Sequence, residues 1–216
     1  MPAHNGAGGG PATRPAPLVE EQRQLARDRI QRAAIAVLRD KGLAATVDEV
    51  AAVAGVSIRT VFRHYGTRDH MIASALRAQL RHYGDTLPRP RVDGPLEDWL
   101  PALLQRVHRL NAELGRAYWE LAALGPTLEG ELAEAAAQRR SGRTKLVSWA
   151  TSTAWRLAGQ RGRAPKWLFD TFAIHLSAFA TRSLVADFGQ PPSEVAEASS
   201  RALLAAVEAA AAAVTR

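Results

Sequence analysis

Two short helices predicted around a single glycine, Gly55, constrain this chain more than any other feature of its sequence. Thr46 and Glu49 have the spacing of a capping box, in which each side chain accepts a hydrogen bond from the other residue's backbone amide, so one helix should begin at Val47. Glycine adopts the left-handed backbone of a tight turn without strain, so this helix should end at Gly55. Apolar residues at helical spacing predict its buried face, namely Val47, Val50, Ala51 and Ala54.

A second helix should run from about Ile58 to Tyr65, with Ser57 as its N-cap. Val61 and Tyr65 lie four residues apart and should face inward together. The outward face is then basic and rich in hydrogen-bond donors: it carries Arg59, Thr60, Arg63 and His64. A small residue at 51, a glycine at 55 and a branched apolar residue at 61 match a helix-turn-helix.

The longer run from Arg29 to Leu76 resembles the N-terminal domain of the TetR family of one-component bacterial repressors. The resemblance rests on RIQRAAIAVLRDKG and on LAATVDEVAAVAGVSIRTVFRHYGTRDHM. The family usually has Thr-Leu-Tyr-x-His-Phe where this chain has TVFRHY from Thr60 to Tyr65, so the tyrosine hydroxyl that often meets the DNA backbone is missing at Phe62. Gly66 replaces the commoner proline or charged residue, and Arg68 stands where the family often has a phosphate-binding lysine.

The composition favours helix throughout, because alanine, leucine and arginine are abundant and β-type alternation is rare. We expect an all-α fold of about nine helices, with a three-helix helix-turn-helix domain followed by a larger helical bundle. The absence of cysteine excludes disulfides and thiolate metal sites, which fits a reducing compartment. No apolar run is long enough to span a bilayer, so we expect a cytoplasmic protein with no membrane partner.

The positive charge is concentrated in the first part of the chain. Residues 1–91 hold 14 Lys and Arg against 8 Asp and Glu, whereas residues 92–216 hold 14 against 13. A local positive field of this kind favours a polyanionic partner. Composition alone would equally fit an arginine-rich surface without such a partner.

The pattern along the chain predicts five regions. They are a disordered tail over residues 1–17, a helix-turn-helix domain over 18–65, a connecting helix over 66–83, a linker over 84–95, and a helical ligand-binding and dimerisation domain over 96–216. Within the last region, Lys166 to Phe188 is apolar on two sides and predicts one helix with neighbours on both faces. The basic run Arg139, Arg140, Arg143 and Lys145 should be solvated, the alternative being a second nucleic-acid site.

A helix-turn-helix reads base edges with the amino end of its second helix. Arg59 can contact guanine with two hydrogen bonds, Thr60 can offer a hydroxyl, and Ile58 can contact a thymine methyl. The remaining candidates suit phosphates or cap the two helices. The expected DNA-binding set is Thr46, Ser57, Ile58, Arg59, Thr60, Arg63, His64, Tyr65 and Arg68.

The resemblance implies that the second domain senses a small molecule and that the chain forms a homodimer through its last two helices. Small residues at 198, 202, 206 and 210 favour the same close helix packing. An apolar or aromatic ligand would be lined by aromatic or polar residues on otherwise apolar faces. The candidates are Trp99, His108, Asn111, Trp119, Trp149, Phe172 and His175, each of which could instead be a core residue.

The sequence therefore predicts a transcriptional regulator, on family grounds a repressor, released from a near-palindromic operator by its ligand. The alternative is a DNA-binding architectural or partner-binding protein that senses no small molecule. An enzyme is a third reading, but no catalytic constellation, metal cluster or cofactor-binding motif occurs, so we expect no catalytic residues, metal or cofactor.

Overall fold

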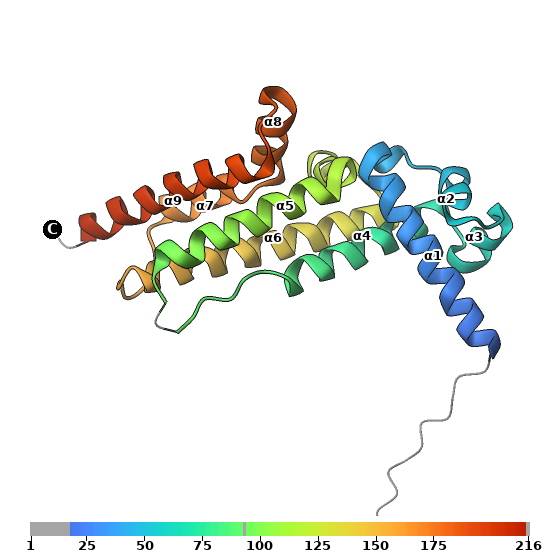
Figure 1. Cartoon of the computed structure of the whole chain (residues 1–216), viewed down its shortest axis with the longest axis horizontal. Coiled ribbons are helices and arrows are strands. Elements are labelled where there is room, and N and C mark those ends of the chain that lie inside the picture. The colour runs from blue at the N-terminus through green and yellow to red at the C-terminus, as the bar shows by residue number, and fades with distance from the viewer. Residues whose placement is uncertain (1–17, 93, 215–216) are drawn as a thin grey trace, which may run out of the picture.

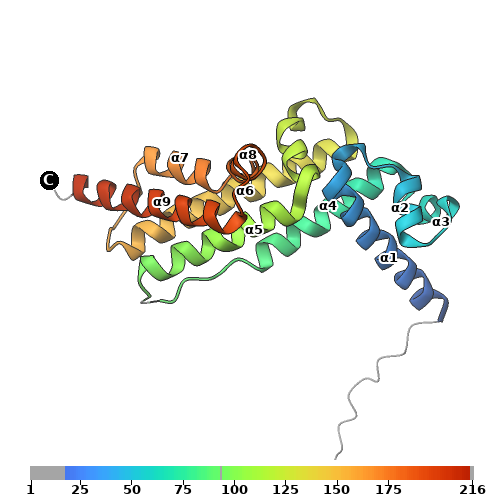
Figure 2. The same ribbon diagram turned by 45° about the horizontal axis from the view of Figure 1, so that its top comes forward.

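A computed structural model describes residues 18–92 and 94–214, and this part of the chain is entirely helix and loop. The tail predicted over residues 1–17 lies outside it. A small group of helices at one end of an elongated molecule joins a long bundle (Figures 1 and 2). The all-α prediction is confirmed, since the described residues contain nine α-helices and two short 3-10 helices. None of the described helices combines the length and apolarity needed to cross a membrane.

The small group consists of α1 (Leu18–Lys41), the 3-10 turn η1 (Gly42–Ala44), α2 (Val47–Ala54) and α3 (Ile58–Tyr65). The predicted capping box is present, with the Thr46 hydroxyl accepting from the Glu49 amide and the Glu49 carboxylate accepting from the Thr46 amide. Gly55 ends α2 in the left-handed conformation, at φ 64°. These local devices fix both ends of α2, as predicted.

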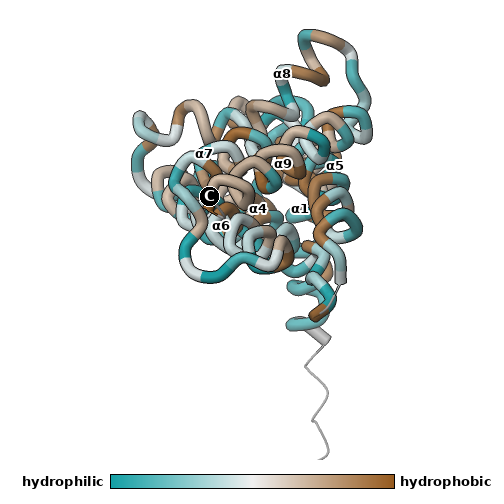
Figure 3. The backbone as a smooth tube through the Cα atoms, turned by 90° about the vertical axis from the view of Figure 1, so that its left-hand side faces the viewer, coloured by the Kyte–Doolittle hydropathy of each residue, from teal (hydrophilic) through white to brown (hydrophobic). Residues whose placement is uncertain are grey.

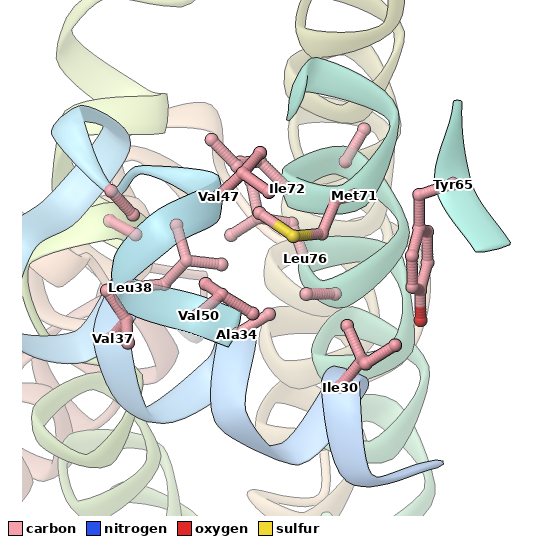
Figure 4. Packing of buried hydrophobic residues seen from close by; sticks show 14 of the residues in the cluster. Ile30, Ala34, Val37, Leu38, Val47, Val50, Tyr65, Met71, Ile72 and Leu76 are labelled. Atoms are coloured by element: carbon pink, nitrogen blue, oxygen red, sulfur yellow. The ribbon is translucent and has the colours of Figure 1, made fainter. Parts of the chain in front are cut away.

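The core of this group is built from α1, α2 and α4 (Arg68–Asp85). Ile30, Ala34, Val37 and Leu38 of α1 meet Val47 and Val50 of α2 and Met71, Ile72 and Leu76 of α4 (Figure 4). α4 continues beyond this core, and Tyr83 near its end is buried in a second hydrophobic core, which the later helices form. One helix therefore contributes to both cores.

The long bundle consists mainly of α5 (Leu96–Ala123), α6 (Gly130–Leu157) and α9 (Pro192–Val214). α9 lies along α5, and α6 packs against α4. The turn η2 (Gly125–Thr127) joins α5 to α6. Leu100, Leu103 and Val107 of α5 are fully buried.

Gly115 divides α5 into two helical segments. Its backbone has φ 62° and ψ −148°, a conformation that is essentially restricted to glycine. A Cβ atom at this position would come within 2.5 Å of the Arg39 carbonyl oxygen. The kink thus places the carboxyl end of α1 directly against α5.

The prediction of one helix from Lys166 to Phe188 is wrong. The chain forms α7 (Lys166–His175) and α8 (Ala178–Phe188), which are separated by Leu176 and Ser177. The Ser177 hydroxyl accepts a hydrogen bond from the Ala180 amide at 3.0 Å and starts a new helix, because serine satisfies a free amide better at an N-cap than within a helix.

α8 consequently projects from the bundle (Figure 3). The expectation that this segment has neighbours on both of its faces is therefore wrong for α8 within a single chain. Phe179 is 48% exposed and Phe188 is 70% exposed.

Candidate nucleic-acid interface and ligand cavities

The recognition-helix candidate α3 is fixed at its start and along its inner face. The Ser57 hydroxyl accepts from the Thr60 amide at 3.2 Å and lies 2.9 Å from the Thr60 hydroxyl. Val61 and Tyr65 are 1% and 5% exposed, so both point into the core as predicted. Tyr65 also hydrogen-bonds through its hydroxyl to the Arg27 carbonyl of α1, at 3.5 Å.

The opposite side of α3 is open to solvent. Arg59 and Arg63 are exposed and form no ion pair among the described residues. Ile58 and Phe62 are 44% and 45% exposed on the same short helix. The unpaired guanidinium groups can contact phosphates or base edges. The exposed apolar side chains beside them can exclude water from those contacts.

His64 lies at the edge of this face and is half-buried. Its Nε2 atom has no hydrogen-bond partner among the described residues. Burial lowers its pKa, and the positive charges of Arg63, Arg27 and Arg23 lower it further. The imidazole is therefore neutral near pH 7, so its contribution to a DNA contact would be a hydrogen bond and not a charge.

Arg23 and Arg27 on α1 widen the basic face beyond the predicted set. Both arginines are exposed and close enough to His64 to influence it. Sequence spacing does not reveal them, because they lie more than 30 residues before the start of α3 along the chain. Only the packing of α1 across α3, with Arg27 lying 5.8 Å from the Tyr65 ring centroid, brings them together.

Two of the predicted phosphate contacts are engaged within the protein. Arg68 donates to the carbonyls of Ala45 and Leu43 and pairs with Asp69 at 2.9 Å, so it fastens α4 to the turn before α2. The Thr46 hydroxyl is exposed but takes part in the capping box. Their contacts with DNA stay predictions, as do those of the other seven residues.

The seven predicted ligand contacts do not converge on one site. Trp99 packs edge-to-face on Trp149 at 5.4 Å, and its indole N–H donates to the Pro88 carbonyl. This pair attaches the predicted linker to the bundle. Phe172 is completely buried in the core.

Three of the candidates hydrogen-bond to hydroxyl groups within the bundle. His108 Nδ1 lies 2.8 Å from the Thr181 hydroxyl, which accepts from the Asn111 amide at 3.0 Å. His175 Nδ1 lies 3.3 Å from the Ser199 hydroxyl. Burial, with a smaller effect of His175, lowers the pKa of His108 to about 4.

Asn111 and Trp119 line a common hollow of about 310 Å³ beside the Gly115 kink. The Trp119 indole N–H has no hydrogen-bond partner among the described residues, and the Arg182 guanidinium covers its ring at 4.2 Å. Asn111 Oδ1 also has no partner there. This hollow is the part of the predicted ligand site that the structure assembles.

A second cavity, of about 160 Å³, lies between α4, α5 and α6, and we call it the tyrosine–arginine cavity. Its walls include Tyr83, Tyr118, Arg139 and Arg143. The Tyr83 and Tyr118 rings stack with centroids 6.1 Å apart, and the Arg139 guanidinium lies 4.6 Å from the Tyr118 centroid. Burial raises the pKa of both tyrosines, so both hydroxyls are protonated near neutral pH.

The expectation that Arg139 and Arg143 are solvated is wrong. Arg139 is only 5% exposed, while Arg143 is half-buried and donates to the Ala173 carbonyl. Arg140 and Lys145 are exposed, as predicted. The missed signal was register: Arg139 lies seven residues before Leu146, and two helical turns place it on the same inward face.

Two carboxylates, buried Glu120 and half-buried Glu131, join the two parts of the molecule. Glu120 on α5 accepts from the Leu43 amide at 2.7 Å and pairs with Arg116. Glu131 on α6 contacts His70 at 2.6 Å and Arg77 at 2.8 Å, both on α4. Specific polar contacts thus connect η1 to α5 and α4 to α6.

Comparison with known proteins agrees with this geometry. The sequence model of the family described as bacterial regulatory proteins, tetR family, matches residues 30–75. Among curated proteins, none matches the chain significantly in sequence. The fold is similar to that of a tetR-family transcriptional regulator from Streptomyces coelicolor, with 20% identity, a TM-score of 0.65, and coverage of 88% of this chain and 83% of that one.

Two further solved structures contain ligands. FadR from Bacillus subtilis, in complex with stearoyl-CoA, is 11% identical with a TM-score of 0.61, over 82% of this chain and 96% of FadR. LfrR from Mycobacterium smegmatis, in complex with proflavine, is 23% identical with a TM-score of 0.56, over 85% of this chain and 96% of LfrR. At these identities the likeness concerns the fold.

Proposed function

We propose that this protein is a ligand-released repressor, because residues 30–75 match the sequence model of the tetR family of bacterial regulatory proteins and the chain has the fold of a tetR-family transcriptional regulator. It would act as a homodimer on a near-palindromic operator and leave that operator when a small molecule binds among its later helices. Its partner being chromosomal DNA, it would work in the cytoplasm.

The observation that carries the proposal is the open basic face of α3. Arg59 and Arg63 have no partner within the described chain, yet the helix beneath them is capped by Ser57 and anchored by Val61 and Tyr65. A rigid helix with free guanidinium groups suits the major groove, where arginine recognises guanine.

Dimerisation is supported by the exposed apolar surface of α8. Phe179 and Phe188 are exposed on a helix that stands out from the bundle. The four predicted small residues of α9 do not lie on one outer face: Ala198 is exposed, Ala202 and Ala206 are half-buried, and Ala210 is buried. A two-fold pair through these helices would set the spacing of two α3 helices on DNA.

Release by a ligand is supported by the cavities between the later helices. The structures of FadR and LfrR, which share the fold, each hold a small molecule. A ligand can shift an equilibrium between DNA-competent and incompetent states only through different affinities for the two. The cavities offer places where such differences can arise.

The experiment begins with selection of bound duplexes from random DNA, which gives the half-site and its spacing. Fluorescence anisotropy then compares wild-type protein with Arg59→Ala on the selected duplex and on a scrambled one. We expect a loss of about 5- to 150-fold on the selected duplex, because a bidentate arginine–guanine contact contributes about 1–3 kcal/mol. Binding to the scrambled duplex should change much less.

Arg156→Ala is the matched control, since Arg156 is also exposed but lies near the carboxyl end of α6, far from α3. It removes the same charge and should leave operator affinity unchanged. Circular dichroism checks that both variants fold. Equal effects of the two substitutions would contradict the assignment of α3, and failure to select any duplex would contradict the proposed function.

A further inference from the structure

Arg139 is a buried charge without a counter-charge. The residue is only 5% exposed, it forms no ion pair with any described residue, and its Nε atom has no hydrogen-bond partner among them. Arginine remains protonated in proteins, and burying an unpaired cation is unfavourable. Tyr118 beneath it does not supply a negative charge, because the pKa of that phenol is raised.

The surroundings of Arg139 repel cations and attract anions. The lining of the tyrosine–arginine cavity includes three arginines, Arg81, Arg139 and Arg143, and no aspartate or glutamate. Arg106, close to Tyr83, is already paired at 4.0 Å with Glu113. A ligand entering this cavity therefore meets net positive charge.

The rest of the wall is mostly apolar. Leu80, Leu87, Leu146 and Leu176 line it together with the two stacked tyrosine rings, and Gln138 adds one neutral polar side chain. A volume of about 160 Å³ holds a molecule on the order of ten non-hydrogen atoms. The apolar walls suit a ligand with an apolar body, and the positive charge of Arg139 suits a negatively charged group at one end of that ligand.

Two glycines lie in the cavity wall. Gly84 in α4 and Gly142 in α6 are both exposed, and a Cβ atom added at either would meet no heavy atom within 4 Å. Glycine within a helix is unfavourable by about 1 kcal/mol relative to alanine, so two exposed wall positions without side chains suit an opening between α4 and α6. Such an opening would give a ligand a passage to Arg139.

We propose that the tyrosine–arginine cavity binds a small amphiphilic carboxylate, with the Arg139 guanidinium taking the carboxylate and the leucine and tyrosine side chains taking the apolar body. This inference rests on the proposed function only in one respect, namely that binding of the carboxylate releases the protein from DNA. The cavity is built partly by Leu80 and Tyr83 of α4, whose other end lies in the core of the DNA-reading helices.

The test uses the full-length protein and three probes of equal chain length: decanoate, 1-decanol and decylammonium. Isothermal titration calorimetry measures each affinity below the micelle concentration. We expect decanoate to bind at least about tenfold more tightly than decanol, because charge-assisted hydrogen bonds are stronger than neutral ones, and decylammonium to bind weakest. Equal affinities, preference for the cation, or no binding of any probe would overturn the proposal.

Arg139→Met separates recognition from mere support of the fold. Methionine replaces the unbranched stem of arginine with an apolar one and carries no charge, so the variant should lose the preference for decanoate and keep its affinity for decanol. Arg140→Met, at the exposed neighbouring position, should keep the wild-type preference. If Arg139→Met does not fold, Gly142→Leu provides the second test, since a side chain there should obstruct the opening and weaken decanoate binding. Unchanged decanoate affinity in the folded variant tested would contradict the role of Arg139 or of the passage.

Operator binding is measured separately, so the two proposals can fail independently. If the wild-type protein recognises an operator but does not bind decanoate, only the proposed class of ligand is overturned. Decanoate binding without any change in operator affinity would uphold the ligand class and contradict release by this ligand. Absence of operator recognition would overturn the proposed function and leave the calorimetric result standing.

Discussion

At the scale of single residues, the chain contains several polar groups that its own fold leaves without a hydrogen bond. Arg139 Nε, His108 Nε2 and Asn111 Oδ1 are all buried and unpartnered among the described residues. Such groups are unfavourable unless a partner completes them. Two of the three lie on the walls of cavities, Arg139 in one and Asn111 in the other.

His108 makes stability depend on pH. Its pKa is lowered to about 4 in the folded protein, against 6.5 for an ordinary histidine, so the unfolded chain binds more protons between these values. Stability should therefore fall as pH decreases from about 6.5 to 4, with His108 contributing a loss of roughly 2 kcal/mol between pH 7.5 and 5. Urea unfolding at the two pH values measures this.

The matched variant is His108→Gln, which keeps a polar group near Thr181 and cannot gain a proton. Its stability should change less between pH 7.5 and 5 than that of the wild type. His175, whose pKa burial also lowers, remains in both proteins and contributes equally. An identical pH dependence in the two proteins would show that His108 is not the titrating group.

The difference between Arg139 and Arg59 shows what sequence can predict at this scale. Arg59 is correctly placed on the surface because its short helix has only one apolar face, which Val61 and Tyr65 define. Arg139 lies in a basic run on a longer helix, and the inward face of that helix passes through the run. The prediction placed the whole run in solvent because of its charge, although the helical register points Arg139 inward. The cavity itself depends on α4, α5 and α6, which are distant in sequence and meet only in the fold.

At the scale of elements, helix ends were predictable where a side chain fixes them locally. Thr46, Ser57 and Gly55 define the limits of α2 and α3 through contacts within a few residues. Ser177 could have been recognised in the same way, but the apolar residues on both sides of it resemble one continuous helix. Its capping contact with Ala180 decides the break.

The kink at Gly115 should be intolerant of any side chain. Gly115→Ala would place a Cβ atom within 2.5 Å of the Arg39 carbonyl oxygen, in a backbone conformation reserved for glycine. We expect destabilisation of about 2–4 kcal/mol, since backbone strain alone costs on the order of 1–3 kcal/mol. Thermal and urea unfolding measure the change.

Gly142→Ala is the control for this prediction. Gly142 lies within α6, and an added Cβ atom would meet nothing within 4 Å. The same chemical change should therefore stabilise the protein by about 0.5–1 kcal/mol through helix propensity. A stable Gly115→Ala protein would show that the contact between α1 and α5 adjusts without cost.

At the scale of the whole molecule, the exposed apolar surface of α8 predicts self-association. Phe179→Glu should convert a dimer into a monomer, because a carboxylate would be buried in the interface without a partner. Analytical ultracentrifugation measures the mass, and operator affinity should fall with it. The control is Val92→Glu, since Val92 is 83% exposed on the loop before α5. A Phe179→Glu protein that remains dimeric would exclude this part of α8 from the interface.

The guanidinium group of Arg139, which has no ion-pair partner among the described residues, affects which variants would survive when a library of this protein is screened. Replacing a buried ion by an apolar residue of similar volume is often neutral or stabilising, so heat resistance and responsiveness make opposite demands on this position. A library screened only for survival at high temperature should accumulate apolar residues at 139. The same library screened for a reversible response to a carboxylate should retain arginine there and accept a lower melting temperature.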